Sequence, residues 1–370
     1  MPRNRVIYQS EALFVGPTSG VITGVGGVPT GTGIIQQLHR VQSANYSFTV
    51  NRQDVNQFGQ LAAIDRVILE QPTVDLDFSY YLNTGFNENA LGLVVNATGA
   101  TSPKGALSNI MQNTGDVKNY YILVSPEGTD ANLDPVTATG QGKTIGIGNA
   151  YLASYNIEAA VGAFPTATVN VSAYNMRFYG ATTGEVPTIS QVDGKNLTQE
   201  DRFFRLSGLT SGSGYTALKP GDISFNLSGA TGVTVSDLKV QSVGINFDIG
   251  REDLQRLGNR FAFAKVITFP LTATMTVDAV LGEIEAGNLA DLINGDCGKY
   301  DLDLTLKGAA CGATTNKQAM KYTFKGAKLD SQEFTSSIGS NKAVTLTFSS
   351  QIGGPTDSGN GVFIEGPESP

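Results

Sequence analysis

The strongest constraint on the fold of this chain is a stretch of 42 residues that occurs twice. Residues 41–82 align without a gap on residues 240–281, and 12 of the 42 aligned positions are identical. Unrelated segments of this length would share roughly two or three identities, so the match is an internal repeat. The shared residues of the first copy are Val41, Gln42, Ser43, Phe48, Arg52, Asp54, Gly59, Ala63, Val67, Ile68, Thr73 and Leu82.

Shorter blocks extend the repeat in the same order along the chain. Residues 105–110 correspond to 287–292, and residues 150–172 correspond to 327–349. Between these blocks, the run YILV at 121–124 matches YDLD at 300–303. We therefore predict two related domains in tandem, at 20–178 and 216–352.

The segments outside the two domains are expected to be arms, linkers or loops. Residues 1–19 form an N-terminal strand and arm, with the strand at 6–15. Residues 179–215 are polar and are interpreted as a linker or surface loop. Residues 353–370 are interpreted as a mobile tail whose apolar triplet, 362–364, docks on a neighbouring subunit.

The composition favours β structure. The chain has 370 residues, more than one hydrophobic core usually organises. Its 44 glycines, scattered among Thr, Ser, Asn and Val, are typical of strands joined by tight turns. The expected fold is mainly β with short helices, arranged as two tandem related domains of β-sandwich or barrel-like form.

Alternating side chains mark the clearest strands. In 74–79, and in its repeat 273–278, apolar and polar residues alternate. Such alternation indicates antiparallel sheets with one face in water. The polar members are Asp75, Asp77 and Ser79 in the first copy and Thr274, Thr276 and Asp278 in the second.

A charged group follows the first strand of each copy. Arg52 and Asp54 recur as Arg251 and Asp253, and each group precedes a shared glycine, Gly59 or Gly258. We interpret these six residues as a turn or interface ion pair with its turn glycine. Apolar residues at i, i+3 spacing after each aspartate predict short helices over 54–61 and 253–260. Further short helices are predicted near 105–112 and 283–294.

Candidate sites for catalysis or cofactor binding are few. The single histidine, His39, excludes a histidine pair for a metal and is expected to be a surface residue. The run GQGKT at 140–144 resembles the end of a phosphate-binding loop but lacks the first glycine, and a strand pattern follows it. Asp75 and Asp77, two residues apart on a wet strand face, are interpreted as solvated side chains. We predict no enzyme activity, no cofactor and no metal.

The charge and the cysteine content indicate which binding partners and which cellular compartment to expect. Thirty-three acidic residues against 25 basic ones give a net charge of −8, which argues against a surface that grips phosphates. The first residues show no secretory h-region and no apolar run reaches 18 residues, so we expect a soluble, unsecreted product with no membrane partner. A bridge between Cys297 and Cys311 is possible, but reduced thiols are the expectation in such a product.

The repeated block contains RQDVNQFG followed by AAIDRVILEQPTVDLDFSYYL. This block resembles the tail tube proteins (major tail proteins) of long-tailed bacteriophages, and in particular is similar to the subset in which the tube domain is duplicated. The resemblance covers both copies and most of the chain. It implies a β-sandwich or barrel-like domain with a flanking helix, whose strands join those of neighbours around a hollow ring. Stacked rings form the tube that conducts viral DNA to the host.

The resemblance also implies partners and a location in the virion. Two tube domains per chain close a sixfold circle with three subunits, a homotrimeric ring of pseudo-sixfold symmetry. The partners are other copies of the chain, the tape-measure protein and transiting DNA in the lumen without specific binding, and a sheath where the tail has one. Assembly takes place in the host cytoplasm. Residues 16–33, 180–215 and the C-terminal tail are the expected ring-stacking segments.

The side chains that line the bore of such a ring are expected to be polar and not to bind DNA. The candidates that face the lumen are Asp75, Asp77, Ser79, Thr274, Thr276 and Asp278. Asp301 and Asp303 are weaker candidates, because an outer strand also turns carboxylates toward water.

Other classes of protein remain open. Another virion protein of tandem β domains, such as a capsid decoration or baseplate protein, would share the composition and the repeat but would not polymerise into tubes. A non-viral β-rich binding module would usually display clustered aromatic side chains, whereas this chain has no Trp and its Tyr residues are dispersed.

Overall fold

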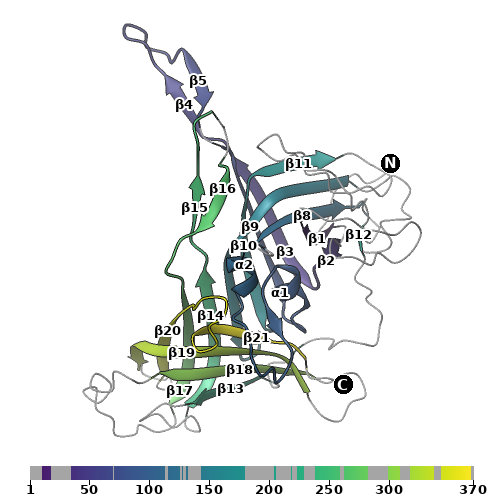
Figure 1. The fold of residues 1–370 in the computed structure, drawn as a ribbon, viewed down its shortest axis with the longest axis vertical. Coiled ribbons are helices and arrows are strands. Elements are labelled where there is room, and N and C mark those ends of the chain that lie inside the picture. The colour runs from purple at the N-terminus through teal and green to yellow at the C-terminus, as the bar shows by residue number, and fades with distance from the viewer. Residues whose placement is uncertain are drawn as a thin grey trace.

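The fold was analysed on a computed structural model, which describes residues 11–17, 35–69, 71–112, 116–125, 127, 131, 143–179, 204–205, 218, 223–228, 238–258, 262–281, 299–308, 317–336 and 343–367. These residues form a mainly β structure with two short helices, α1 (Phe86–Ala90) and α2 (Ser108–Met111), which confirms the prediction of a mainly β fold with short helices (Figure 1). Seventeen strands belong to one connected sheet, and two hairpins stand apart from it. None of the helices described is long and apolar enough to span a membrane.

Eight strands form a continuous antiparallel run, here called the central sheet. The spatial order is β3 (Val41–Thr49), β6 (Thr73–Tyr81), β10 (Thr166–Ala173), β9 (Lys143–Ala160), β14 (Leu238–Asp248), β17 (Thr272–Leu281), β20 (Ala343–Gln351) and β19 (Lys317–Thr335). The first four strands come from the first repeat and the last four from the second. β9 and β14 pair where the halves meet, with Ile157 opposite Ile245, and we call this contact the internal junction.

The strand pairings of the two halves repeat position for position. Ser43 lies opposite Ser79 after a bulge, and the residues at the same places in the second copy, Ser242 and Asp278, lie opposite each other after the same bulge. The bulge of β9 against β10 likewise recurs in β19 against β20. These shared registers support the interpretation of the chain as two related domains, whose boundaries stay a prediction.

One block of the sequence alignment needs correction. Lys118 pairs with Ala150 in the first half, and Tyr300 pairs with Ala327, the counterpart of Ala150, in the second. Lys118, rather than Tyr121, is therefore the counterpart of Tyr300, and the match between 121–124 and 300–303 is wrong by three residues. A four-residue block held together by one tyrosine and alternating apolar residues does not fix its own register.

A second layer of strands covers the apolar face of the central sheet. In the first half it contains β1 (Glu11–Pro17), β2 (Ile35–Gln37), β8 (Val117–Val124), β11 (Asn175–Tyr179) and β12 (Phe204–Arg205). In the second half it contains β13 (Ile223–Ser228), β18 (Tyr300–Gly308) and β21 (Gly361–Glu365). β7 (Val95–Asn96) comes from the first half and pairs with β21 in this layer. β9 and β19 are long enough to run through both layers. One connected hydrophobic core therefore extends through both halves of the chain.

The segments that follow β3 and β14 are hairpins, so the helices predicted over 54–61 and 253–260 are wrong. β4 (Arg52–Val55) pairs with β5 (Asp65–Ile68), and β15 (Arg251–Leu254) pairs with β16 (Ala264–Ile267). Apolar residues three apart also fit a strand that runs into a loop. Gly59 and Gly258 lie in these loops with φ of 86° and 89°, a conformation that disfavours other residues. The helix predicted near 105–112 is confirmed as α2, and 283–294 lies outside the described residues.

Two further expectations are changed by the structure. The triplet 362–364 is buried in β21, where it pairs with β19 and β7 of its own chain, so its docking on a neighbour is wrong. His39 is half-buried and stacks on Phe86 at 4.3 Å between ring centroids, so it is not a simple surface residue. Burial and the charge of Arg40 lower the pKa of His39.

Other sequence features lie wholly or partly outside the described residues. Cys297 and Cys311 are both outside. The strand predicted at 6–15 is described only from Glu11, where β1 begins, and the residues after 142 in the glycine-rich run begin β9 as a strand.

Candidate functional site

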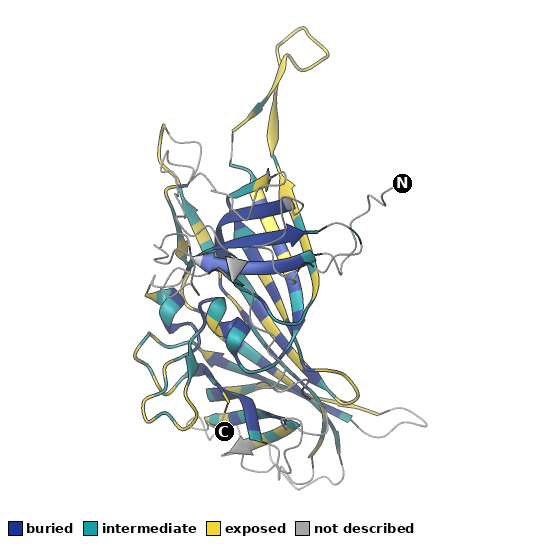
Figure 2. Ribbon diagram, turned by 90° about the vertical axis from the view of Figure 1, so that its right-hand side faces the viewer, coloured by how far each residue is buried: buried dark blue, intermediate teal, exposed yellow. Residues whose placement is uncertain are grey.

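One face of the central sheet is polar across all eight strands. Residues that pair directly across an antiparallel sheet point to the same side, so the pairing registers define this face. Exposed and buried positions alternate along its strands (Figure 2). This polar face comprises Ser43, Asn45, Ser47, Asp75, Asp77, Ser79, Ser154, Asn156, Glu158, Thr166, Thr168, Asn170, Ser242, Gly244, Asn246, Asp248, Thr274, Thr276, Asp278, Ser331, Glu333, Thr345, Thr347 and Ser349. It includes all six residues named as candidates for a lumen.

Six charged side chains of the polar face are acidic: Asp75, Asp77, Glu158, Asp248, Asp278 and Glu333. By the same pairing rule, Lys328, opposite Ser349, and Lys239, opposite Val280, also lie on this side of the sheet, so the face is acidic on balance. Neutral neighbours hold some of the acidic side chains in place. Asp77 accepts a hydrogen bond from Asn45 Nδ2 at 2.8 Å, and Asp278 accepts one from Thr345 Oγ1 at 2.6 Å. Lys265 of the hairpin β15–β16 also reaches this face, where its Nζ donates to Ser172 Oγ at 3.0 Å, and Ser172 lies opposite Asp75.

The weaker candidates, Asp301 and Asp303, lie elsewhere. Both belong to β18, in the second layer. Asp303 accepts a hydrogen bond from Thr323 and lies 3.1 Å from Lys321 Nζ, and Asp301 accepts one from the Gly326 amide. The structure does not bring them together with the polar face.

The central sheet ends in two edges that correspond to the two strands of the internal junction. β3 is the counterpart of β14 and pairs, among the described strands, only with β6. Residues 331–335 of β19 are the counterpart of 154–158 of β9 and pair, within the same description, only with β20. Burial differs accordingly. Phe247 and Ile157 are 1% and 0% exposed, whereas their counterparts Phe48 and Phe334 are 59% and 51% exposed.

The hairpin β15–β16 packs on the first half of the chain. Arg251 donates to both carboxylate oxygens of Asp116 and, at 3.1 Å, to the Leu152 carbonyl. The side chains of Arg251 and Asp116 are 3% and 4% exposed, so this is a buried bidentate ion pair. Asp253 accepts a hydrogen bond from the Tyr174 hydroxyl at 2.8 Å. Burial lowers the pKa of Lys265, against the opposing charge of Asp253.

The hairpin β4–β5 projects from the body of the protein and is exposed along most of its length (Figures 1 and 2). Arg52 and Asp54, the counterparts of Arg251 and Asp253, are both exposed. Asp54 accepts from Arg66 Nε at 2.6 Å, between side chains that are 49% and 67% exposed. Within the described part of the chain, the repeated Arg and Asp therefore pack on another segment in the second copy only.

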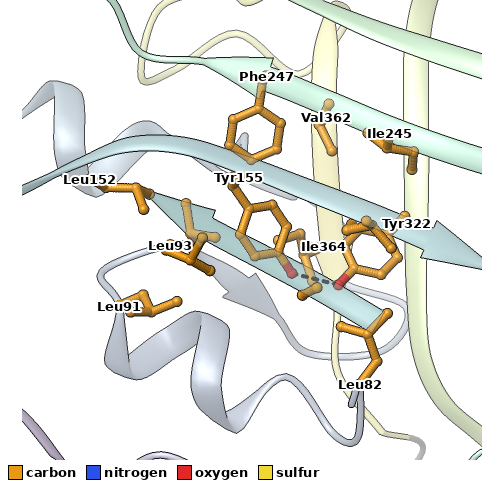
Figure 3. Packing of buried hydrophobic residues seen from close by; sticks show 14 of the residues in the cluster. Leu82, Leu91, Leu93, Leu152, Tyr155, Ile245, Phe247, Tyr322, Val362 and Ile364 are labelled. Atoms are coloured by element: carbon orange, nitrogen blue, oxygen red, sulfur yellow. Dashed lines mark hydrogen bonds between the residues drawn. The ribbon is translucent and has the colours of Figure 1, made fainter. Parts of the chain in front are cut away.

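A buried polar cluster joins the two halves in the core. Glu88 of α1 accepts hydrogen bonds from the hydroxyls of Tyr80 and Tyr155, at 2.7 and 2.8 Å. The hydroxyls of Tyr155 and Tyr322, one from each half, are 2.9 Å apart (Figure 3). Burial raises the pKa of Glu88. Sequence reasoning missed this cluster, because four residues on four separate elements form no local pattern.

Comparisons with known proteins provide little guidance. No family model matches the chain, and no curated protein matches it. A similar solved structure is a chain of the anti-feeding prophage baseplate, determined by cryo-EM and 6-fold symmetrised. The identity is 15% and the TM-score 0.27, over 49% of this chain and 99% of that chain. A TM-score this low carries no argument about function.

Of the residues described, no group of three or more His, Cys, Asp or Glu could hold a metal ion.

Proposed function

We propose that this chain is a structural virion protein that assembles as stacked trimeric rings into the tail tube of a long-tailed bacteriophage. The observation that carries the proposal is the internal junction. Each chain contains one complete contact between a first repeat and a second repeat, and its two outer edges present the same two strands again.

If two chains meet at their outer edges in the same way as β9 and β14 meet within one chain, they form a specific contact, here called the seam. β19 of one chain lies beside β3 of the next in the register that β9 and β14 adopt. This register places Phe334 opposite Tyr46 and Gln332 opposite Phe48, as Ile157 lies opposite Ile245 and Tyr155 opposite Phe247. Such a head-to-tail contact closes into a ring if the rotation is right and otherwise extends as a helix. Two repeats per chain make three chains equivalent to a sixfold ring.

The polar face then lines the bore. The second layer of strands covers the opposite face, so the polar face is the side of the sheet left for the interior. Its acidic residues outnumber the lysines on the same side and repel the phosphates of DNA, whereas a basic lining would bind them through counterion release. Asp75, Asp77, Ser79, Thr274, Thr276 and Asp278 face the lumen. The tube acts without catalysis or a cofactor, and DNA and the tape-measure protein pass through it without specific binding.

Electron microscopy of the concentrated protein tests the assembly. Negative-stain images and averaged end-on views are expected to show hollow rings or tubes with threefold symmetry and a pseudo-sixfold outline. Compact, isolated particles under every condition, with the tail initiator present, would instead favour a decoration or baseplate protein.

A matched pair of disulfides tests the seam itself. In a Cys297→Ser, Cys311→Ser background, Ser47→Cys with Glu333→Cys should link chain to chain, up to a covalent trimer. The control is Asn156→Cys with Asn246→Cys, the counterparts at the internal junction, which lie directly opposite each other in one chain. The control should form its disulfide within one chain, so that the chain remains a monomer on a non-reducing gel. If only the control oxidises in concentrated protein, the seam is wrong.

A further inference from the structure

We infer that the hairpin β4–β5 is a docking arm, whose base packs on the second half of the adjacent chain in the same ring, against β19 and β20. The inference rests on the proposed function, because it requires the seam. It names a second interface for which the chain also carries its own template, the packing of β15–β16 on the first half.

The two hairpins are built alike. Arg52 lies opposite Ile68 in β4–β5, as Arg251 lies opposite Ile267 in β15–β16. Each hairpin continues directly from the strand that forms one side of a junction, β3 or β14. A seam in the internal register therefore carries β4–β5 to the place on the next chain that β15–β16 occupies within its own chain.

The receiving surface offers matching chemistry. Leu329 stands where Leu152 does, and its carbonyl is the acceptor for Arg52, as the Leu152 carbonyl is for Arg251. Ser349 is the counterpart of Ser172 and accepts from Arg66, which replaces Lys265. The backbone carbonyl and the serine hydroxyl are thus the same in both surfaces.

Three further positions change residue type. Gly298 is the counterpart of Asp116 in the alignment of Lys118 with Tyr300, so Arg52 has no counterpart of the carboxylate that binds Arg251. Gln351 replaces Tyr174, so an amide takes the place of the hydroxyl that donates to Asp253. Lys328 replaces Tyr151, over whose ring Arg251 lies at 5.0 Å, so a cation stands where the template has an aromatic neighbour for its arginine. The second surface therefore lacks the bidentate ion pair and the aromatic contact of the first, and its polar partners are the Leu329 carbonyl, the Ser349 hydroxyl and the Gln351 amide.

Apolar exposure locates the contact at the base of the hairpin. Ile267 packs against the core, whereas its counterpart Ile68 is 47% exposed, and Leu69 beside it is 64% exposed. At the tips, Phe58 and Leu257 are both fully exposed, at 105% and 103%. The packed hairpin thus covers its base and leaves its tip free. An isolated two-stranded hairpin is marginally stable in water, so its exposed apolar base calls for the same cover.

Photocrosslinking tests the docking. p-Benzoylphenylalanine is placed at Arg66 in one variant and at Lys265 in a matched control, and the products are mapped by mass spectrometry after assembly. The Lys265 probe should react within its own chain near 172–174. The Arg66 probe should join two chains, with the crosslink at 349–351.

Each result distinguishes the inference from the proposed function. If the seam disulfide and the tubes form, but the Arg66 probe reaches another surface or another ring, the inference fails and the tube remains. If neither seam disulfide nor tubes form, the proposed function fails first.

A second pair of variants does not depend on the probe. Ile68→Ser should raise the concentration needed for assembly at least tenfold and leave the melting temperature of the unassembled chain unchanged. Ile267→Ser should lower that melting temperature. Normal assembly of the Ile68→Ser variant would overturn the inference.

Discussion

The internal junction and the two outer edges of the central sheet are built from related strands, yet only the junction is buried within one chain. Phe247 is 1% exposed in β14, and the same residue type at the same place in β3, Phe48, is 59% exposed. The difference lies in the neighbouring strand, which is β9 in one case and is not part of the chain's described sheet in the other. One sequence pattern therefore stabilises the fold at the junction and is left available for assembly at the edge.

The largest expected effect is a difference in unfolding free energy between the same substitution at Phe247 and at Phe48. Phe247→Asp places an unpaired carboxylate beside Tyr155, 5.3 Å away between ring centroids, and should cost more than about 4 kcal/mol of unfolding free energy. Phe48→Asp should cost less than about 1 kcal/mol in the unassembled chain, because water reaches the site. Urea unfolding followed by circular dichroism gives both values.

Assembly should respond in the opposite sense. The Phe48→Asp variant is expected to fold normally and to form no tubes, since its carboxylate would be buried in the seam. Tubes of normal appearance from this variant would break the equivalence between the junction and the edge.

The second comparison concerns the two arginines of the hairpins. Arg251→Ala leaves the Asp116 carboxylate buried without its partner and should cost roughly 3–5 kcal/mol. Arg52→Ala removes an exposed side chain and should change the unfolding free energy by no more than about 0.5 kcal/mol. Equal losses in thermal or chemical unfolding of the unassembled chain would mean that β4–β5 is packed within its own chain.

A smaller effect is expected from the polar cluster in the core, which the two halves do not share. Tyr80 donates to Glu88 in the first half, and its counterpart in the second is Ala279. The folded chain binds the Glu88 proton more tightly than the unfolded chain, because burial raises its pKa. Glu88 therefore stabilises the fold below its unfolded pKa, near 4.5, and this contribution is lost as the pH rises through the folded pKa.

Glu88→Gln keeps an acceptor for the two tyrosines and removes the ionisation. Relative to this variant, the wild type should lose unfolding free energy as the pH rises from 4 to 8. Urea titrations at a series of pH values measure the difference. A gap that stays constant with pH would show that Glu88 ionises as easily in the folded state as in the unfolded one.

The sequence predicted the repeat and the alternating strands well, since both depend on patterns within one segment. Val74 and Asp75 lie on opposite faces of β6, as their spacing required. The hairpins were mistaken for helices, because β4 is defined by its pairing with β5, ten residues farther along. The burial of Glu88 and the contrast between Phe48 and Phe247 were also beyond local patterns, because they depend on which strand lies next in the sheet.

The smallest expected effect on stability belongs to the polar face, and it decides which way that face points. Asp77→Cys in the Cys297→Ser, Cys311→Ser background alters an exposed side chain and should change the unfolding free energy by less than about 0.5 kcal/mol. Lys104→Cys, on the exposed loop before α2, is the matched control. After labelling with a maleimide gold cluster, end-on averages should show the Asp77 label inside the ring and the Lys104 label outside it. If the gold at Asp77 lies on the outer wall, the acidic residues face the solvent around the tube. The polar face would then not line the bore, and its acidic residues could not repel DNA there.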